Sequence, residues 1–177
     1  MSNAFIYRMP AGIPGNISRQ PETATVETQL NDAGNPVTAF GLPAVMDSTA
    51  FALRPFGSGD TAASIYGFVV RPFPTQGSSS NVQNSFGQGT PAVPGPIDVL
   101  KRGYINVQLN GTTQSTKNGT VYVRISANGA NTIVGGVEAA ADGSHTVALT
   151  NAYFTGPADA TPTSGASASN AEVAFNI

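Results

Sequence analysis

The sequence predicts an all-β protein, folded as an antiparallel jelly roll or a small Greek-key barrel with long loops and an extended N-terminal arm. Short runs rich in Val, Ile, Thr and Tyr alternate apolar and polar side chains, which is the pattern of strands with one buried face. Turn signals built from Gly, Pro and Asn-Gly pairs separate these runs. The one helix candidate is the short stretch 58–64, with Ser58 or Asp60 as its N-cap.

Residues 1–21 are predicted to form the extended arm, because Pro10, Pro14 and Pro21 exclude a stable helix. The arm also carries apolar side chains that need burial. The sequence leaves open whether they pack on their own domain or on another chain. The residues predicted to bind a partner are Phe5, Ile6, Tyr7, Arg8, Met9 and Ile13.

Residues 22–177 are predicted to form a single β-rich domain. In its first half, turn residues separate four strand-like runs, and two of these runs close with the tripeptide Arg-Pro-Phe. Since proline cannot donate a ladder hydrogen bond, each tripeptide marks a strand end or a sheet edge. The segment 74–96 is rich in Ser, Gly, Gln and Pro, which is typical of a long loop or a linker. It is a possible boundary between two lobes. The four runs are 24–30, 36–46, 50–56 and 64–73.

The second half predicts further short antiparallel strands at 104–109, 121–126, 144–149 and 171–177. Asn-Gly pairs predict tight hairpin turns, since both residues tolerate positive φ. In the strand at 121–126, alternation predicts that Arg124 lies on the solvated face, with Tyr122 and Ser126, and that Val121, Val123 and Ile125 are buried. The three Asn-Gly pairs are Asn110-Gly111, Asn118-Gly119 and Asn128-Gly129.

The composition indicates a weakly charged surface. Charged residues make up 10% of the chain, against about a quarter in an average soluble protein, and the net charge is only -2. A surface of Ser, Thr, Asn, Gln and Gly suits dense packing against neighbours. The eight Lys and Arg form no basic patch for nucleic acid, and no apolar run reaches the roughly 18 residues of a membrane span. The chain has no Cys, and we expect no cofactor or metal.

We expect no enzymatic activity. The single histidine, His145, lacks a nucleophile-elbow pattern around it, and the adjacent Ser144 would point to the opposite strand face. His145 is therefore predicted to be a surface strand residue. The ten carboxylates form no calcium-loop pattern, although two of them could meet in space.

The segments 60–76, 94–111, 119–160 and 171–177 resemble the structural cement proteins of tailed bacteriophages. The resemblance implies a β-rich decoration protein without catalytic residues. It implies that the protein binds the outer surface of the phage head and bridges subunits of the major capsid protein. The implied partners are that shell protein and the chain itself, as a dimer or trimer. The implied location is the virion, after synthesis in the host cytoplasm.

Two other classes of function stay open at this point. One is a receptor- or glycan-binding module of a virion, for which Tyr7, Tyr66 or Tyr153 could form an aromatic platform. The other is a small hydrolase that acts through His145.

Overall fold

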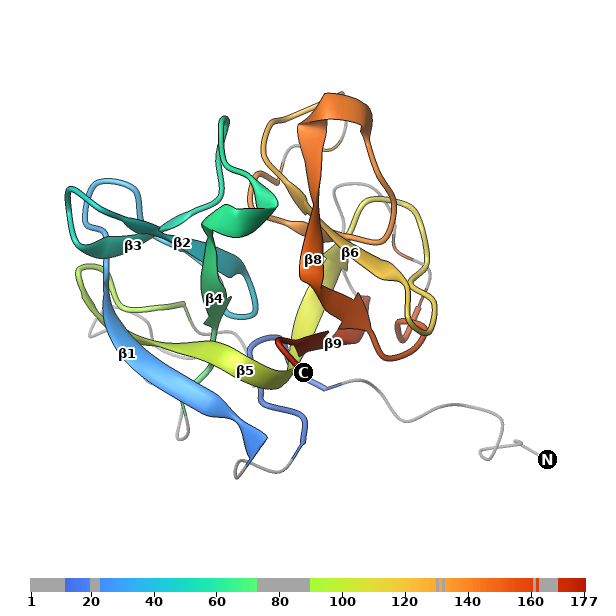
Figure 1. The fold of residues 1–177 in the computed structure, drawn as a ribbon, viewed down its shortest axis with the longest axis horizontal. Coiled ribbons are helices and arrows are strands. Elements are labelled where there is room, and N and C mark those ends of the chain that lie inside the picture. Colours follow the sequence, from blue (N-terminus) through green and yellow to red (C-terminus); the bar gives the residue numbers. More distant parts are fainter. Residues whose placement is uncertain are drawn as a thin grey trace.

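The computed structural model describes residues 12–19, 23–72, 90–129, 131, 133–160, 162 and 169–177. The regular secondary structure in this part of the chain is almost entirely β-strand, which confirms the predicted fold class (Figure 1). Two short 3₁₀ turns, η2 (Ala62–Ser64) and η3 (Gly143–His145), interrupt the strands. The strands are β1 (Thr25–Asn31), β2 (Pro43–Asp47), β3 (Ala52–Pro55), β4 (Ile65–Val69), β5 (Gly95–Asn110), β6 (Thr120–Arg124), β7 (Val137–Glu138), β8 (Thr146–Phe154) and β9 (Asn170–Phe175).

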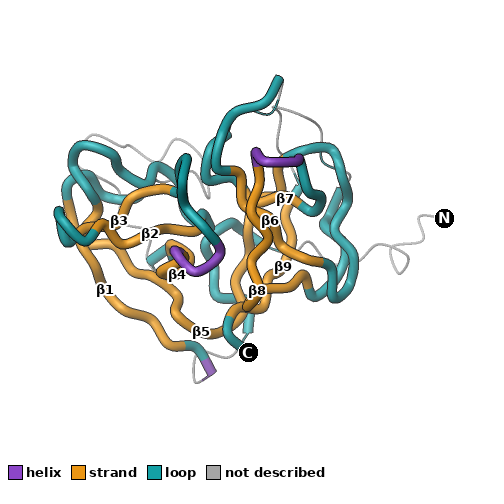
Figure 2. The backbone as a smooth tube through the Cα atoms, turned by 45° about the horizontal axis from the view of Figure 1, so that its top comes forward, coloured by secondary structure: helices purple, strands orange, loops and turns teal. Residues whose placement is uncertain are grey.

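Strand pairing closes the sheet into two rings that share β5. The first ring runs β1–β3–β2–β4–β5 and closes where β5 pairs with β1, and the second runs β5–β7–β6–β8–β9 and closes where β9 pairs with β5. The two rings form the two halves of the molecule in Figures 1 and 2. Most pairings are antiparallel, and short parallel contacts join β1 to β3 and β5 to β7. The architecture is barrel-like, because ring closure leaves few open edges.

The long strand β5 changes partners near its middle. Its first half pairs with β1 up to Arg102, and its second half pairs with β9 from Gly103 onward. Gly103 has a φ of 138°, and a Cβ there would lie 3.2 Å from side-chain atoms of both Ala24 and Leu100. The change of partner therefore requires glycine.

A shared core holds the two rings together. The larger hydrophobic cluster combines Phe68 and Leu100 of the first ring with Val107 and Phe175 of the second. The rings of Phe68 and Phe175 meet edge to face, with centroids 5.2 Å apart. A second cluster, built around Val37, Leu53 and Val99, fills the first ring alone.

The tight turn predicted at Asn128-Gly129 is present, because Asn128 and Asn131 exchange two backbone hydrogen bonds of 2.9 Å and form an antiparallel bridge. The hairpins predicted at Asn110-Gly111 and Asn118-Gly119 are wrong. Gly111, Asn118 and Gly129 do adopt the predicted positive φ, at 80°, 60° and 56°. However, β5 ends at Asn110 and β6 begins only at Thr120. The end of β5 lies beside β7, in parallel, and not beside β6. Asn-Gly supplies the backbone conformation of a turn, but the strand that follows is selected by packing.

The helical turn is present where it is predicted, but its cap differs. Thr61 is the N-cap of η2, and neither Ser58 nor Asp60 is. The Asp60 carboxylate is occupied elsewhere, because it accepts two hydrogen bonds from Arg54 at 2.7 and 2.8 Å. The second turn, η3, replaces the start of the strand predicted at 144–149, so β8 begins at Thr146. Residues 74–89 of the loop 74–96 lie outside the described residues. The predicted single domain, with a possible lobe boundary in this loop, therefore stays a prediction.

Candidate interaction surfaces

The β2–β3 hairpin presents an aromatic side chain to solvent. Asp47 builds the turn: its Oδ1 accepts hydrogen bonds from the backbone N–H groups of Thr49 and Ala50 at 2.7 and 3.0 Å. The hydrogen bonds from Ala50 and Thr49 lower the pKa of Asp47. The Phe51 N–H then donates to the Asp47 carbonyl at 2.9 Å. The hairpin tip is therefore a defined structure.

Phe51 is the most exposed large apolar side chain in the described part of the chain, at 77% of its surface, and its φ is 52°. A left-handed conformation costs a residue other than glycine roughly 1–2 kcal/mol. An exposed ring gains nothing from the fold that would offset this cost. Aromatic side chains often supply much of the binding energy of protein interfaces. The sequence predicts neither the exposure nor the positive φ of Phe51, because this residue reads there as an ordinary member of the strand at 50–56.

A second exposed apolar element lies at the opposite end of β3. Ile133 and Val134 precede Gly135 in the loop before β7 and are 40% and 38% exposed. Gly135 lies against Pro55, since a Cβ on this glycine would be 3.6 Å from the Pro55 Cβ. The two apolar elements are therefore separated by the length of β3.

Residues 12–19 of the predicted arm pack against their own chain. The Gly15 N–H donates to the Asn106 carbonyl at 2.8 Å, and the Ser18 N–H donates to the Tyr104 carbonyl at 3.1 Å. An antiparallel bridge between Ile17 and Ile105 lies between these two bonds. The segment thus adds to β5 as a short strand.

An ion pair holds the end of this segment. Arg19 donates to both carboxylate oxygens of Glu172, at 2.9 and 3.0 Å, and its guanidinium lies 3.9 Å from the centroid of the Tyr104 ring. Burial alone would raise the pKa of Glu172. The hydrogen bonds from Arg19, Thr155 and Ser18 outweigh burial and hold this pKa below its ordinary value.

Among the predicted partner-binding residues, Ile13 is half-buried at the start of this segment. Phe5, Ile6, Tyr7, Arg8 and Met9 lie outside the described residues, so their role stays a prediction.

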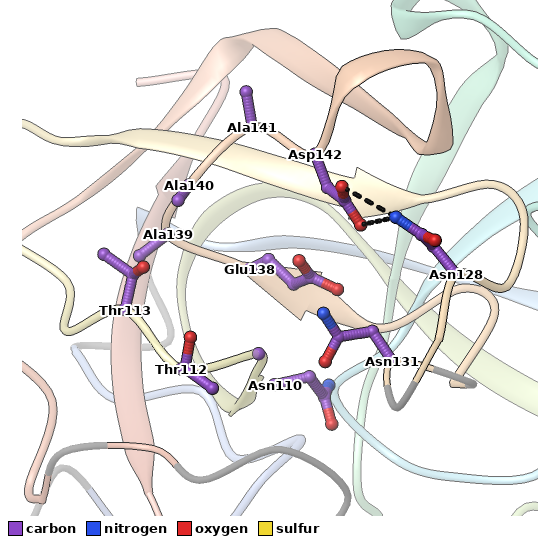
Figure 3. Close-up of a pocket in the computed structure, with 11 residues that line it drawn as sticks. Asn110, Thr112, Thr113, Asn128, Asn131, Glu138, Ala139, Ala140, Ala141 and Asp142 are labelled. Carbon is purple, nitrogen blue, oxygen red and sulfur yellow. Dashed lines mark hydrogen bonds between the residues drawn. The ribbon is translucent and has the colours of Figure 1, made fainter.

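A polar pocket of about 210 Å³ opens on the second ring (Figure 3). Two of the Asn-Gly segments line it, through Asn110 and Asn128, together with Glu138 of β7 and Asp142 from the following loop. Figure 3 shows Asn128 bonded to Asp142, at 3.0 and 3.2 Å from its two oxygens.

Arg124 neutralises the carboxylates beside this pocket. Its side chain is 1% exposed, which corrects the prediction that it lies on a solvated face. It donates to Glu138 at 2.5 and 3.0 Å and to Asp142 at 2.8 Å. The bonds from Arg124 and Asn128 lower the pKa of Asp142. Both carboxylates therefore share one guanidinium as their partner.

His145 is also occupied by a structural contact. Its Nδ1 lies 2.8 Å from the Ser126 hydroxyl, and the side chain is half-buried at the end of η3. The prediction of a surface strand residue is therefore wrong. Throughout the described ranges, no three His, Asp or Glu side chains gather as metal ligands, and no helix is long and apolar enough to cross a membrane.

The described tyrosines named for a glycan platform lie in separate clusters. Lys101 covers the Tyr66 ring, with Nζ 3.3 Å from the ring centroid, and the Tyr66 hydroxyl donates to Glu27 at 2.6 Å. Tyr153 lies near Arg19 and pairs with Ala174 of β9, which in turn pairs with Tyr104 of β5. A sugar stacks on an open aromatic face, and Lys101 covers one face of the Tyr66 ring.

Comparison with known proteins identifies relatives of the whole chain. A family model described as the XM1 gp53 minor capsid protein matches residues 1–174. A solved chain from the capsid of Myoviridae phage XM1 has a similar fold, with a TM-score of 0.64 and 15% sequence identity. The alignment covers 99% of this chain and 97% of that chain. A search of curated proteins finds no match.

Proposed function

The chain belongs to the XM1 gp53 minor capsid protein family, and on this premise we propose that it is a capsid cement or decoration protein. In this proposal it binds the outer surface of a phage head and bridges neighbouring major capsid protein subunits. The observation that carries the proposal is the family match over residues 1–174. As a member of this family the protein is a structural component of the virion.

The shared core supports a bridging role. A protein that links two shell subunits stabilises the shell only if it resists deformation between its two contacts. The edge-to-face pair of Phe68 and Phe175 lies where the two rings meet, and both side chains are at most 1% exposed. Close-packed interiors of this kind transmit strain with little compression.

The two exposed apolar elements support contact with more than one subunit. Phe51 lies at one end of β3, and Ile133 and Val134 lie beside the other end. Each is a small surface for binding. On a shell lattice, however, a second contact forms at high effective concentration, so avidity can exceed single-site affinity by about 10² or more.

The charge distribution supports close packing of many copies. At least five of the ten carboxylates form ion pairs with arginine inside the same chain. Internal pairing removes these charges from the repulsion between neighbouring copies. We propose no catalytic activity, because the best candidate groups, Glu138, Asp142 and His145, are held by structural bonds.

The test is a comparison of stripped and redecorated particles. Heads freed of this protein should release DNA at a lower temperature than heads that retain it, and addition of the purified protein should restore the parent value. Heads treated with the same buffer but not stripped are the control. A release temperature that does not depend on the protein would contradict the cement role.

A further inference from the structure

Strand β1 is exposed to an unusual degree for a strand in a closed ring. Both faces of the strand reach solvent, since its exposed residues are Thr25, Val26, Glu27, Thr28 and Leu30. In Figures 1 and 2, β1 runs along the margin of the first ring, with β5 on its inner side. Its contact with β3 is confined to its last residue, Asn31, which pairs with Leu53.

The outer edge of β1 has unpaired backbone groups. In an antiparallel ladder, alternate residues direct their N–H and C=O groups to opposite edges. Asp32 donates to Leu53 of β3 at 2.9 Å, so residues of the same parity face away from β5. Val26 and Thr28 share that parity. Their N–H and C=O groups have no backbone partner within the described ranges.

Open strand edges bind extended segments by strand addition. The N-terminal region of this chain already binds in that way, since residues 15–18 add to β5 through backbone hydrogen bonds. Residues 1–11 precede this short strand and contain the predicted partner-binding side chains Phe5, Ile6, Tyr7, Arg8 and Met9.

Residues 1–11 and the β1 edge are chemically complementary. In an extended segment, Phe5, Tyr7 and Met9 share one face, and Arg8 lies on the other. On β1, the large apolar side chains Val26 and Leu30 share one face, at 39% and 50% exposure. Glu27 lies on the other face of β1. Strand addition would therefore place the apolar side chains of the segment against those of β1. Arg8 is the one charged side chain of residues 1–11, and it would lie beside the carboxylate of Glu27.

The course of the chain favours a second copy as the source of this segment. Residues 12–19 run antiparallel to β5, from Ser18 beside Tyr104 back to Gly15 beside Asn106. Gly12 is held further along, where its carbonyl accepts a hydrogen bond from Asn170 at 3.0 Å. The chain therefore leads away from the half of β5 that pairs with β1.

We propose that residues 4–9 of one copy bind as an added strand to the outer edge of β1 on a second copy. Since each copy offers one segment and one edge, the contact runs head to tail and can link successive copies. The inference extends the proposed function to self-association and does not require the shell.

A peptide of residues 1–11 tests the acceptor edge on purified protein. It should bind a variant that lacks residues 1–11, as measured by fluorescence anisotropy. Thr28→Pro should weaken binding by about tenfold or more, because the outward N–H is lost and the proline ring obstructs the edge. The backbone N–H and C=O groups of Thr28 are directed away from β5, so the substitution spares the ladder within the ring. It does remove the hydrogen bond of 2.6 Å from the Thr28 hydroxyl to Asp98 of β5. No binding of the peptide, or equal binding to Thr28→Pro, would overturn the proposal.

A charge exchange keeps the test decisive if the proline variant fails to fold. Glu27→Lys should weaken binding of the natural peptide by roughly two- to fivefold, the usual range for a cross-strand pair. A peptide with Arg8→Glu should regain that loss on the Glu27→Lys protein. An unchanged affinity in either arm would place the peptide elsewhere and overturn the proposal.

Mixing two defective variants tests the head-to-tail geometry. The variant without residues 1–11 keeps its edge, and Thr28→Pro keeps its segment. Each should sediment as a monomer when alone, and their mixture should form a dimer. The unaltered chain, which has both segment and edge, should itself associate. If it sediments as a monomer while the mixture forms a dimer, each segment occupies its own edge, and the claim of a second copy is wrong.

Discussion

The aromatic rings of Phe68 and Phe175 meet edge to face across the junction of the two rings of strands, with centroids 5.2 Å apart and planes at 77°. Phe68 belongs to β4 of the first ring and Phe175 to β9 of the second. The contact predicts that the two rings unfold together. Phe175→Ala should lower the free energy of unfolding by about 3–5 kcal/mol, through lost burial and the cavity that remains.

Calorimetry and hydrogen exchange measure this coupling. A single calorimetric transition is expected for the parent and the variant, with a melting temperature lower by roughly 6–20 °C in the variant. Amide protection should fall in both rings. Loss of protection in the second ring alone would show that the two rings of strands unfold independently. The shared core would then not explain how the protein forms a rigid bridge between shell subunits.

The buried pair of Arg124 and Glu138 predicts a strong asymmetry between single and double substitutions. Arg124→Met should destabilise the protein by about 3–5 kcal/mol, because the buried Glu138 carboxylate loses its partner. Combining Arg124→Met with Glu138→Leu should recover most of this loss, since no buried charge is left unpaired. Urea denaturation measures both values. A double variant as unstable as the single one would contradict this explanation.

Stability should fall in acid. The pKa values of Asp60, Asp142 and Glu172 lie below their ordinary values in the folded protein. The unfolded chain therefore binds more protons than the folded one as the pH falls through about 4, and the free energy of unfolding decreases there. Above about pH 5 these groups should contribute their full stabilisation. Urea midpoints between pH 3 and 7 test this, and a midpoint that rises toward pH 3 would refute it.

Loss of the Phe51 ring should weaken attachment to the shell much more than it lowers the stability of the fold. Phe51→Asn keeps a residue that tolerates positive φ and removes the exposed ring. We expect a free energy of unfolding within about 0.5 kcal/mol of the parent, as for other surface changes. Binding to stripped heads should weaken clearly. Phe51→Tyr is the matched control and should bind as the parent does, while equal binding by the Asn variant would exclude the hairpin tip from the interface.

The sequence predicts the strands better than it predicts their partners. Alternation locates β1, β6 and β9 to within about a residue or two, because side-chain period depends on local geometry. The long strand β5 is predicted only at 104–109, since Pro96 and the charged pair Lys101-Arg102 hide the pattern of its first half. Ring closure depends on contacts between distant segments, such as β1 with β5, which no local pattern contains.

The burial of individual side chains is also hard to predict from local sequence. Arg124 reads as solvated, because its partners Glu138 and Asp142 lie 14 and 18 residues away. Phe51 reads as an ordinary member of the strand at 50–56, because the turn built by Asp47, which precedes β3, is not evident from the sequence. The apolar character of the N-terminal segment, by contrast, is evident from the sequence alone.

The most direct measurement is a cryo-electron microscopy reconstruction of the phage head that carries this protein. The cement role predicts density for the two fused rings on the outer surface, repeated over the lattice, with each copy in contact with at least two major capsid protein subunits. The β2–β3 tip should lie in one of these contacts. Density inside the shell, or only at the tail, would contradict the proposed function.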